Sequence, residues 1–321
     1  MNYFVFGGSG FIGTHLVNEL YVKLPSVVIY NLDIVESDHG SKSTFIKTDV
    51  RNQIRLNIPI SAEDIIFNFA AVHRTPGHPD IEYFETNIRG AENITKFAEQ
   101  YGIKKIIFTS SIAPYGASES KKEETTLPTP NTPYGISKLV AEKIHQIWQA
   151  GNAERELTVL RPGVVFGKNE NGNFTRLYWG IKGKRFFYPG RKDTIKASIY
   201  VKDLVGFMLY KIENHEPGTE LFNCTYEPAY TIEEIVETMS SVTGLRAPKL
   251  VVSGKLMIIA AAIFGVIGGK KLGIHPDRVK KLMISTNISG KKLSESGYQF
   301  QYNLETGIQD WYADNENIFL K

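Results

Sequence analysis

Five apolar runs divide the first half of the chain, and stretches with helical spacing lie between them. The runs cover residues 3–6, 27–32, 65–70, 106–109 and 157–160, and the helical stretches cover 13–22, 84–101 and 134–150. Apolar runs without polar interruptions are typical of parallel strands that are buried on both faces. The pattern predicts an α/β fold in which helices cover both faces of a doubly wound parallel sheet.

This rhythm breaks after Gly163. Residues 167–190 are rich in glycine and aromatic side chains, a strand-and-helix pattern returns at 199–204, and short helices and irregular segments dominate from about 218. We therefore expect one domain over residues 1–165, to which 195–215 return. A smaller, discontinuous C-terminal lobe is expected over 166–194 and 216–321.

Three glycines follow the first apolar run. Gly7, Gly10 and Gly13 are each separated by two residues, and a helical stretch follows them. A turn at a helix N-terminus presents N–H groups and the positive end of the helix dipole to a pyrophosphate. Asp33, which ends the second run, can accept both ribose hydroxyls of adenosine. The sequence predicts a Rossmann-like dinucleotide site.

The charge around Asp33 selects between two cofactors. Glu36 and Asp38 follow it, and no arginine occurs before Arg51. A 2′-phosphate placed about 4 Å from a carboxylate would meet a repulsion of a few kcal/mol at an effective dielectric constant of about 20. The sequence therefore predicts NAD rather than NADP.

Composition excludes several other classes of protein. The formal charge is +3 and no basic block exceeds a Lys-Lys pair, so nothing indicates a nucleic-acid partner. The single cysteine, Cys224, excludes an internal disulfide framework, and we expect it to be buried. The seven histidines show no ligand spacing, so no metal is expected. Met1 leads directly into the first strand, which favours a cytoplasmic protein.

One apolar segment covers residues 256–268 and is flanked by Lys255 and Lys270. As a helix, its 13 residues would span about 20 Å, short of a hydrocarbon core of roughly 30 Å. We expect a buried or capping helix, with contact to one membrane leaflet as the open alternative.

A tyrosine and a lysine lie four residues apart at Tyr134 and Lys138, on one face of an expected helix. The chain contains four such pairs, but only Tyr134 both begins a long helical stretch and follows a buried strand that ends in hydroxyls, at Thr109-Ser110-Ser111. A nearby ammonium lowers the pKa of a phenol. Tyr134 is therefore the predicted general acid or base.

These features occur together with further motifs. The full set is G-x-x-G-x-x-G, Asp33, Asp49-Val50, Asn68-Phe-Ala-Ala71, Asn87, Ser110-Ser111-Ile-Ala-Pro-Tyr115-Gly116, Tyr134-x-x-x-Lys138, Arg161-Pro162 and Tyr200-Val-Lys-Asp203. Together they resemble the extended short-chain dehydrogenase/reductase family, of the NAD-dependent nucleotide-sugar epimerase/dehydratase kind. The resemblance covers nearly the whole chain and is strongest over residues 1–205.

The resemblance implies roles for individual residues. Tyr134 would be the acid/base, Lys138 would hold the nicotinamide ribose and tune Tyr134, and Ser111 would hydrogen-bond the reacting oxygen of the substrate. The remaining implied cofactor contacts are Gly7, Gly10, Phe11, Ile12, Gly13, Asp33, Asp49, Val50, Ala70, Ala71, Asn87 and Pro162.

The residues after Ser111 narrow the reaction. Dehydratases of this family carry Asp-Glu there and decarboxylating members carry Glu, whereas this chain has Ile112-Ala113. What remains is oxidation and reduction at one sugar carbon, expected to be C4, in an epimerase or a 4-ketoreductase. The resemblance also implies polysaccharide biosynthesis as the setting, and a homodimer that packs through 84–101 and 134–150.

The implied substrate contacts are Asn173, Phe174 and Lys196 in the second lobe, with His73 and Ser111 in the first. Many family members have an arginine near the substrate phosphates, three residues before the Tyr-Val pair. In this chain Lys196 lies one residue upstream of that position. Lysine keeps the charge but loses the bidentate fork. A solvated surface lysine remains the alternative for Lys196, and a loop cap remains the alternative for His73.

Two other functions stay open. A net dehydrogenase of a hydroxysteroid-like or other apolar alcohol would use the same Ser/Tyr/Lys set, and the apolar segment 256–268 favours it. A non-catalytic NAD-binding sensor would keep the fold, although it would not need that set.

Overall fold

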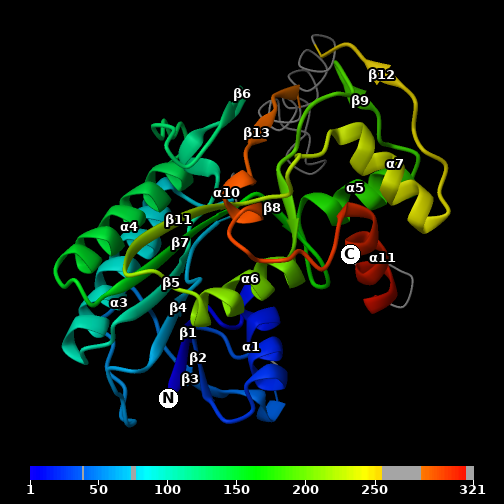
Figure 1. The fold of residues 1–321 in the computed structure, drawn as a ribbon. Helices are drawn as coiled ribbons and strands as arrows, with labels where there is room; N and C mark the ends of the chain where they lie inside the picture. Colours follow the sequence, from blue (N-terminus) through cyan, green and yellow to red (C-terminus); the bar gives the residue numbers. More distant parts are fainter. Residues whose placement is uncertain (38–39, 74–76, 255–282, 316–321) are drawn as a thin grey trace. The chain divides into compact units, whose positions relative to one another are not determined.

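A computed structural model describes residues 1–37, 40–73, 77–254 and 283–315. The chain forms two compact units (Figure 1). Unit 1 comprises Met1–Gly116, Glu124–Pro162 and Val201–Cys224, and unit 2 comprises Ala117–Glu123, Gly163–Tyr200 and Thr225–Lys321. Whether these are the cofactor and substrate domains expected from the sequence stays a prediction.

Unit 1 contains a seven-stranded parallel sheet in the order β11-β7-β5-β4-β1-β2-β3. Its strands are β1 (Asn2–Phe6), β2 (Val28–Asp33), β3 (Thr44–Lys47), β4 (Ile65–Asn68), β5 (Lys105–Thr109), β7 (Glu156–Pro162) and β11 (Gly218–Cys224). The strand order reverses direction at β1, as in a doubly wound sheet. The predicted fold class is confirmed.

Helices cover both faces of this sheet. α3 (Arg89–Gln100) packs against α4 (Pro133–Ala150), and α1 (Phe11–Lys23) packs against α6 (Val201–Glu213), with the two pairs on opposite sides of the sheet in Figure 1. The shorter helical segments of unit 1 are η1 (Gly40–Lys42), α2 (Asp80–Tyr83), η2 (Phe84–Ile88) and η3 (Ala113–Tyr115). Phe4, Phe6 and Phe97 lie in the core beneath α3.

Two strands of the sheet were not expected. β3 and β11 are edge strands: no residue of β3 is buried, and only the last three residues of β11 are buried. An edge strand needs no continuous apolar run, because one side remains open to solvent. The sequence predicts that short helices and irregular segments dominate from about residue 218, and this prediction does not include β11. By its contacts β11 lies in unit 1, whereas the sequence predicts 216–321 for the second lobe.

Unit 2 is built from short strand pairs and helices. The pairs are β8 (Val164–Phe166) with β10 (Ser198–Tyr200), β9 (Tyr188–Pro189) with β12 (Val251–Val252), and β6 (Ser118–Lys122) with β13 (Thr286–Ile288). Its helices are α5 (Asn173–Lys182), α7 (Ile232–Thr243), α10 (Lys291–Ser294) and α11 (Leu304–Asp314).

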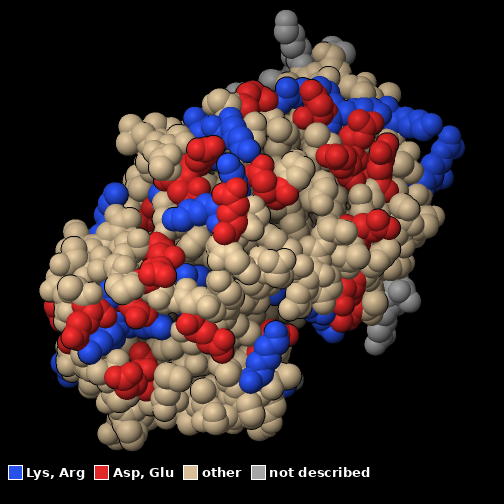
Figure 2. Space-filling view, in the orientation of Figure 1, with Lys and Arg blue, Asp and Glu red and all other residues tan. Residues whose placement is uncertain are grey.

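Lys and Arg side chains mix with Asp and Glu across the face drawn in Figure 2. Cys224 is buried and has a free thiol. Among the residues that the structure describes, no helix is long and apolar enough to cross a membrane. The apolar segment 256–268 lies outside the described residues.

Candidate active site

The glycine turn leaves no room for side chains. Gly7 has a φ of +78°, and a Cβ atom on it would lie 2.7 Å from the backbone nitrogen of Ala70. A Cβ on Gly13 would lie 2.5 Å from the carbonyl oxygen of Gly7. Gly10 precedes α1, and no side-chain hydrogen bond caps the helix. The backbone at the start of α1, where Phe11 and Ile12 lie, therefore suits an anion such as pyrophosphate.

The structure brings Asp33 to this turn. Its carboxylate accepts hydrogen bonds from the N–H of Ser9 at 3.1 Å and from the N–H of Ile34 at 2.7 Å. The side-chain amide of Asn31 donates to the Ser9 hydroxyl at 3.0 Å, which ties the same turn to β2. Asp33 and the glycine turn thus lie side by side, as a site for adenosine and pyrophosphate requires.

Asp49 and Val50 lie in the loop after β3. Asp49 pairs with Arg51 at 2.6 Å, and the Arg51 guanidinium lowers the pKa of the Asp49 carboxyl. The carbonyl oxygen of Val50 accepts a hydrogen bond from the Asn93 side chain at 2.8 Å. Helix α3 therefore fixes the loop expected to flank the adenine.

Asn87 links the end of β4 to α4. Its side chain accepts from the N–H of Val72 at 2.8 Å, and donates to the Val72 carbonyl at 3.1 Å and to the Ser137 hydroxyl at 2.8 Å. Ala70 and Ala71 immediately precede Val72, and His73 follows it at an exposed position. Asn87 thus holds the loop that follows β4 against the helix that contains Ser137.

Helix α4 carries the expected catalytic pair. Thr132 caps the helix by accepting from the N–H of Gly135 at 3.1 Å, and Pro133 occupies its first turn. A Cβ on Gly135 would lie 2.7 Å from the carbonyl oxygen of Ala113. This missing side chain allows the helix to approach the loop that carries Ser111.

The environment of Tyr134 differs from the expectation. Burial raises the pKa of Tyr134, while a hydrogen bond with Ser111 acts in the opposite direction. The ring of Tyr83 lies 6.2 Å from the ring of Tyr134 and adds to the rise in the pKa of Tyr134. Ser111 and Tyr134 are brought together as predicted, but the expected lowering of the Tyr134 pKa by a cation is wrong for this geometry.

Lys138 shows why. It is 2% exposed, its Nζ donates a hydrogen bond to the Thr109 carbonyl at 2.6 Å, and it lies 4.4 Å from the centre of the Phe108 ring. Burial lowers the pKa of Lys138 to about 7, and the neighbouring Glu142 opposes that fall. In this geometry the ammonium is bound to the end of β5 rather than to the phenol.

Sequence reasoning missed several buried polar residues beside this pair. Glu142 accepts hydrogen bonds from Ser110 and from both Nε and Nη2 of Arg161, at 2.9 Å and 2.6 Å for the arginine. His145 stacks on Phe108 with ring centres 4.2 Å apart. Tyr134, Lys138 and Glu142 recur at intervals of four residues, so the sequence places them on one helix face but does not show that Glu142 is buried.

Arg161 on β7 and Asn223 on β11 both contact Tyr115, which extends the group of buried polar residues. The Arg161 guanidinium lies 4.6 Å from the centre of the Tyr115 ring, and the Tyr115 hydroxyl donates to Asn223 at 3.0 Å. The N–H of Asn223 donates to Glu124 at 2.8 Å. Pro162, an expected cofactor contact, follows Arg161 at the end of β7.

The other expected substrate residues belong to unit 2. Asn173 begins α5 and accepts a hydrogen bond from Arg176 at 3.1 Å, while Phe174 is buried and stacks on Phe166 at 4.5 Å. Lys196 donates to the Ile284 carbonyl at 2.7 Å, and burial lowers its pKa to about 8. Their contacts with substrate stay predictions.

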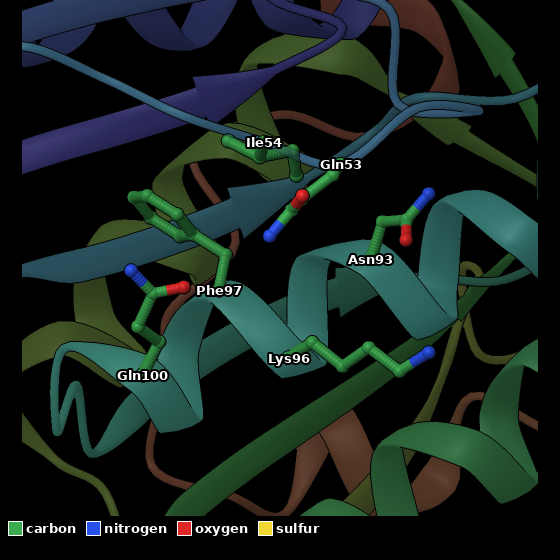
Figure 3. A pocket seen from close by; sticks show the side chains of 6 residues that line it. All are labelled: Gln53, Ile54, Asn93, Lys96, Phe97 and Gln100. Atoms are coloured by element: carbon green, nitrogen blue, oxygen red, sulfur yellow. The ribbon is translucent and has the colours of Figure 1, made fainter.

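Unit 1 has a pocket of about 270 Å³ (Figure 3). Gln53, Ile54, Asn93, Lys96, Phe97 and Gln100 line it. Within the described part of the chain, no group of three or more His, Cys, Asp and Glu side chains could hold a metal ion.

The parallel sheet and the glycine turn at its carboxyl edge are the architecture of a Rossmann-like dinucleotide-binding protein. The sequence profile of the NAD-dependent epimerase/dehydratase family matches residues 3–225. The chain therefore belongs to the NAD-dependent epimerase/dehydratase family.

Individual relatives agree with this assignment. The chain is 32% identical to an N-acetyl-alpha-D-glucosaminyl-diphospho-ditrans,octacis-undecaprenol 4-epimerase of Escherichia coli O157:H7, over 96% of this chain and 93% of that protein. It is 35% identical to a UDP-glucose 4-epimerase of Lacticaseibacillus casei, over 76% of this chain and 82% of the relative. A solved structure of MoeE5 with UDP-glucuronic acid and NAD has the same fold, with a TM-score of 0.75 at 23% identity over 98% of this chain and 100% of the other.

Proposed function

We propose that this protein catalyses the NAD-dependent 4-epimerisation of a hexose that is carried on a diphosphate. The observation that carries the proposal is the hydrogen bond between Ser111 and Tyr134 beside the buried Lys138, in a member of this family. The chain also lacks the acidic residues that the family's dehydratases carry after Ser111.

The residues of the first unit fit NAD. In the turn of Gly7, Gly10 and Gly13, the positions of Gly7 and Gly13 have no room for side chains, so the turn can present backbone to the pyrophosphate. Asp33 can offer its carboxylate to the adenosine ribose. When bound, NAD supplies the acceptor that takes a hydride from the sugar carbon and returns it.

The chain's own side chains handle the proton. Ser111 and Tyr134 clamp the oxygen on C4 of the sugar, and Tyr134 moves the proton to and from that oxygen. In the oxidation of C4 the phenolate form of Tyr134 accepts the hydroxyl proton as the hydride leaves, and in the reduction the resulting neutral phenol returns that proton to the keto oxygen. Burial raises the pKa of Tyr134 and so favours the neutral, proton-donating form. Lys138 lies one helical turn behind and orients the nicotinamide ribose.

A nucleoside diphosphate is the first candidate for the sugar carrier. It would place the enzyme in the cytoplasm, in the supply of sugars for polysaccharide biosynthesis. His73, Asn173, Phe174 and Lys196 are the side chains that we propose to contact this substrate.

A polyprenyl diphosphate is the second candidate for the carrier. Two observations favour it: the relative that matches 96% of the chain is named for an undecaprenol-linked sugar, and residues 256–268 are apolar. Leu250 and Ile284, which flank this part of the sequence, are exposed apolar residues.

The test supplies the same sugar on both carriers. Purified protein with NAD is incubated with UDP-glucose, UDP-N-acetylglucosamine or N-acetylglucosaminyl diphosphate on a short polyprenol, and the 4-epimers are quantified by NMR. Conversion of one carrier class identifies the carrier. Net formation of NADH without an epimer would contradict the proposal and favour the dehydrogenase alternative.

We also propose a homodimer that packs through α3 and α4. The two helices lie side by side, and Ile147 on α4 is 72% exposed although it is apolar. An exposed isoleucine on a helix that already packs a neighbour suits a second helix pair from another copy of the chain.

A further inference from the structure

Glu142 is the centre of a buried cluster that consists of Ser110, Lys138, Glu142 and Arg161. The Glu142 and Arg161 side chains are 1% and 4% exposed, so solvent does not screen their interaction. The carboxylate accepts three hydrogen bonds, one from the Ser110 hydroxyl and two from the Arg161 guanidinium. One side chain therefore joins α4 to the ends of β5 and β7.

Glu142 is close in the chain or in space to two proposed catalytic groups, Lys138 and Ser111. Lys138 lies one turn earlier on α4, and Ser110 precedes Ser111 in the chain. The backbone of this loop is also bound to β7, because the N–H of Ser110 donates to Leu160 at 2.7 Å and the N–H of Ile112 donates to Pro162 at 3.2 Å. Displacing Arg161 or Glu142 would consequently shift the loop that carries Ser111.

The charges in the cluster are unequal. Lys138 and Arg161 are two buried bases; Glu142 is hydrogen-bonded to Arg161, lies four residues from Lys138 on α4 and acts to raise the pKa of Lys138. Arg161 cannot lose its proton in a protein, whereas a buried lysine can. Loss of the carboxylate would therefore be compensated by deprotonation of Lys138.

The other titratable groups packed here do not replace Glu142. His145, on the same helix, accepts a hydrogen bond from Asn68 at Nε2 and donates one to Ala141 at Nδ1, and burial lowers its pKa to about 4. Tyr115 on η3 and Tyr134 on α4 are phenols whose pKa values burial raises. Tyr83 on α2 faces Tyr134.

We propose that Glu142 is a positioning residue for the reaction, because its carboxylate favours the charged form of Lys138 and holds Ser110, and with it Ser111, against α4. This inference rests on the proposed function only for the roles of Ser111 and Lys138. Its electrostatic part concerns the chain alone.

The decisive measurement is the titration of Lys138 by NMR in protein labelled with ¹³C-lysine, with equal NAD content in every sample. The Lys138 signal is assigned from its absence in Lys138→Met. In Glu142→Gln we expect the midpoint to fall by at least one pH unit relative to wild type, a tenfold loss of proton affinity. An unchanged midpoint overturns the inference.

Glu156→Gln is the matched control, because Glu156 also pairs with a lysine, Lys105, at 2.8 Å, but at the other end of β7. Its Lys138 midpoint should equal that of wild type. If Glu142→Gln does not fold, Glu142→Asp replaces it. The shorter side chain withdraws the carboxylate, so the Lys138 midpoint should fall by about half a unit, and a wild-type midpoint again overturns the inference.

Ser110→Ala separates positioning from charge. It removes one hydrogen bond to Glu142 and no charge, so the Lys138 midpoint should stay at the wild-type value while kcat falls at least fivefold and KM changes less than twofold. A wild-type kcat contradicts the positioning role. Absence of epimerase activity in wild type, together with a shifted midpoint in Glu142→Gln, would sink the proposed function but leave the electrostatic link intact.

Discussion

Tyr134 is a phenol that the structure holds by burial and by one hydroxyl partner, Ser111. Replacing it with phenylalanine removes the group that moves the proton but keeps the ring that packs near Tyr83. We expect Tyr134→Phe to lower kcat at least 100-fold, within the range that general acid–base catalysis contributes. NAD affinity, measured by calorimetry, should change little. Turnover at the wild-type rate would exclude Tyr134 as the acid/base.

The lowered pKa of Lys138 predicts how the free energy of unfolding depends on pH. Its pKa is about 7 in the folded protein and about 10.5 when unfolded, so the unfolded state binds more protons between these values. The free energy of unfolding should therefore rise with pH across this window, while below pH 7 both states are protonated and the full penalty remains.

The measurement compares wild type with Lys138→Met by urea unfolding at pH values of about 6.5 and 9.5. Methionine cannot titrate, so wild type should gain on the order of a few kcal/mol relative to the variant at the higher pH. Parallel pH profiles for the two proteins would show that Lys138 is not a destabilised cation.

At the level of elements, the strands with continuous apolar runs and the helices between them could be predicted from the sequence. β3 and β11 could not, because edge strands need no continuous apolar run. The dinucleotide turn was predictable because only glycine fits at positions 7 and 13, so the turn leaves a recognisable pattern in the sequence.

The buried cluster could not be predicted in the same way. A glutamate on a helix is ordinarily solvated, and nothing in the local sequence shows that Glu142 is buried. Its burial depends on Arg161, which arrives from a strand of the sheet. The prediction that a cation lowers the pKa of Tyr134 was wrong for a related reason. Spacing shows which side chains share a helix face, but not which acceptor the Lys138 ammonium binds.

The start of α4 offers a test of how closely it must approach its neighbour. Alanine at Gly135 would place Cβ 2.7 Å from the backbone oxygen of Ala113 and push the helix away from the Ser111 loop. We expect Gly135→Ala to destabilise the protein by about 1–3 kcal/mol. A displacement of about 1 Å would lower kcat by roughly 100-fold.

Gly180→Ala is the control for this substitution. Gly180 is also helical, but the nearest atom to its added Cβ, on Phe186, is 3.5 Å away. Alanine there should be neutral or should stabilise by up to about 1 kcal/mol. Equal effects of the two substitutions on thermal unfolding would refute the close approach at Gly135.

On the scale of the whole molecule, the proposed homodimer predicts that one substitution will change the oligomeric state. Ile147→Asp would bring a charge into the α3 and α4 interface, and sedimentation at micromolar concentration should then report a monomer. Leu127→Asp is the control, because Leu127 is 80% exposed and lies outside both helices. A dimer that survives Ile147→Asp, or a monomeric wild type, would reject this interface.

The chain passes between unit 1 and unit 2 five times, after residues 116, 123, 162, 200 and 224. Neither unit is therefore a single gene fragment. Replacing unit 2 alone with that of a relative would require three separated pieces of sequence to be exchanged together. If Asn173, Phe174 and Lys196 contact the substrate as proposed, sugar specificity in this chain should change more readily by point substitutions and local insertions than by exchange of a whole domain.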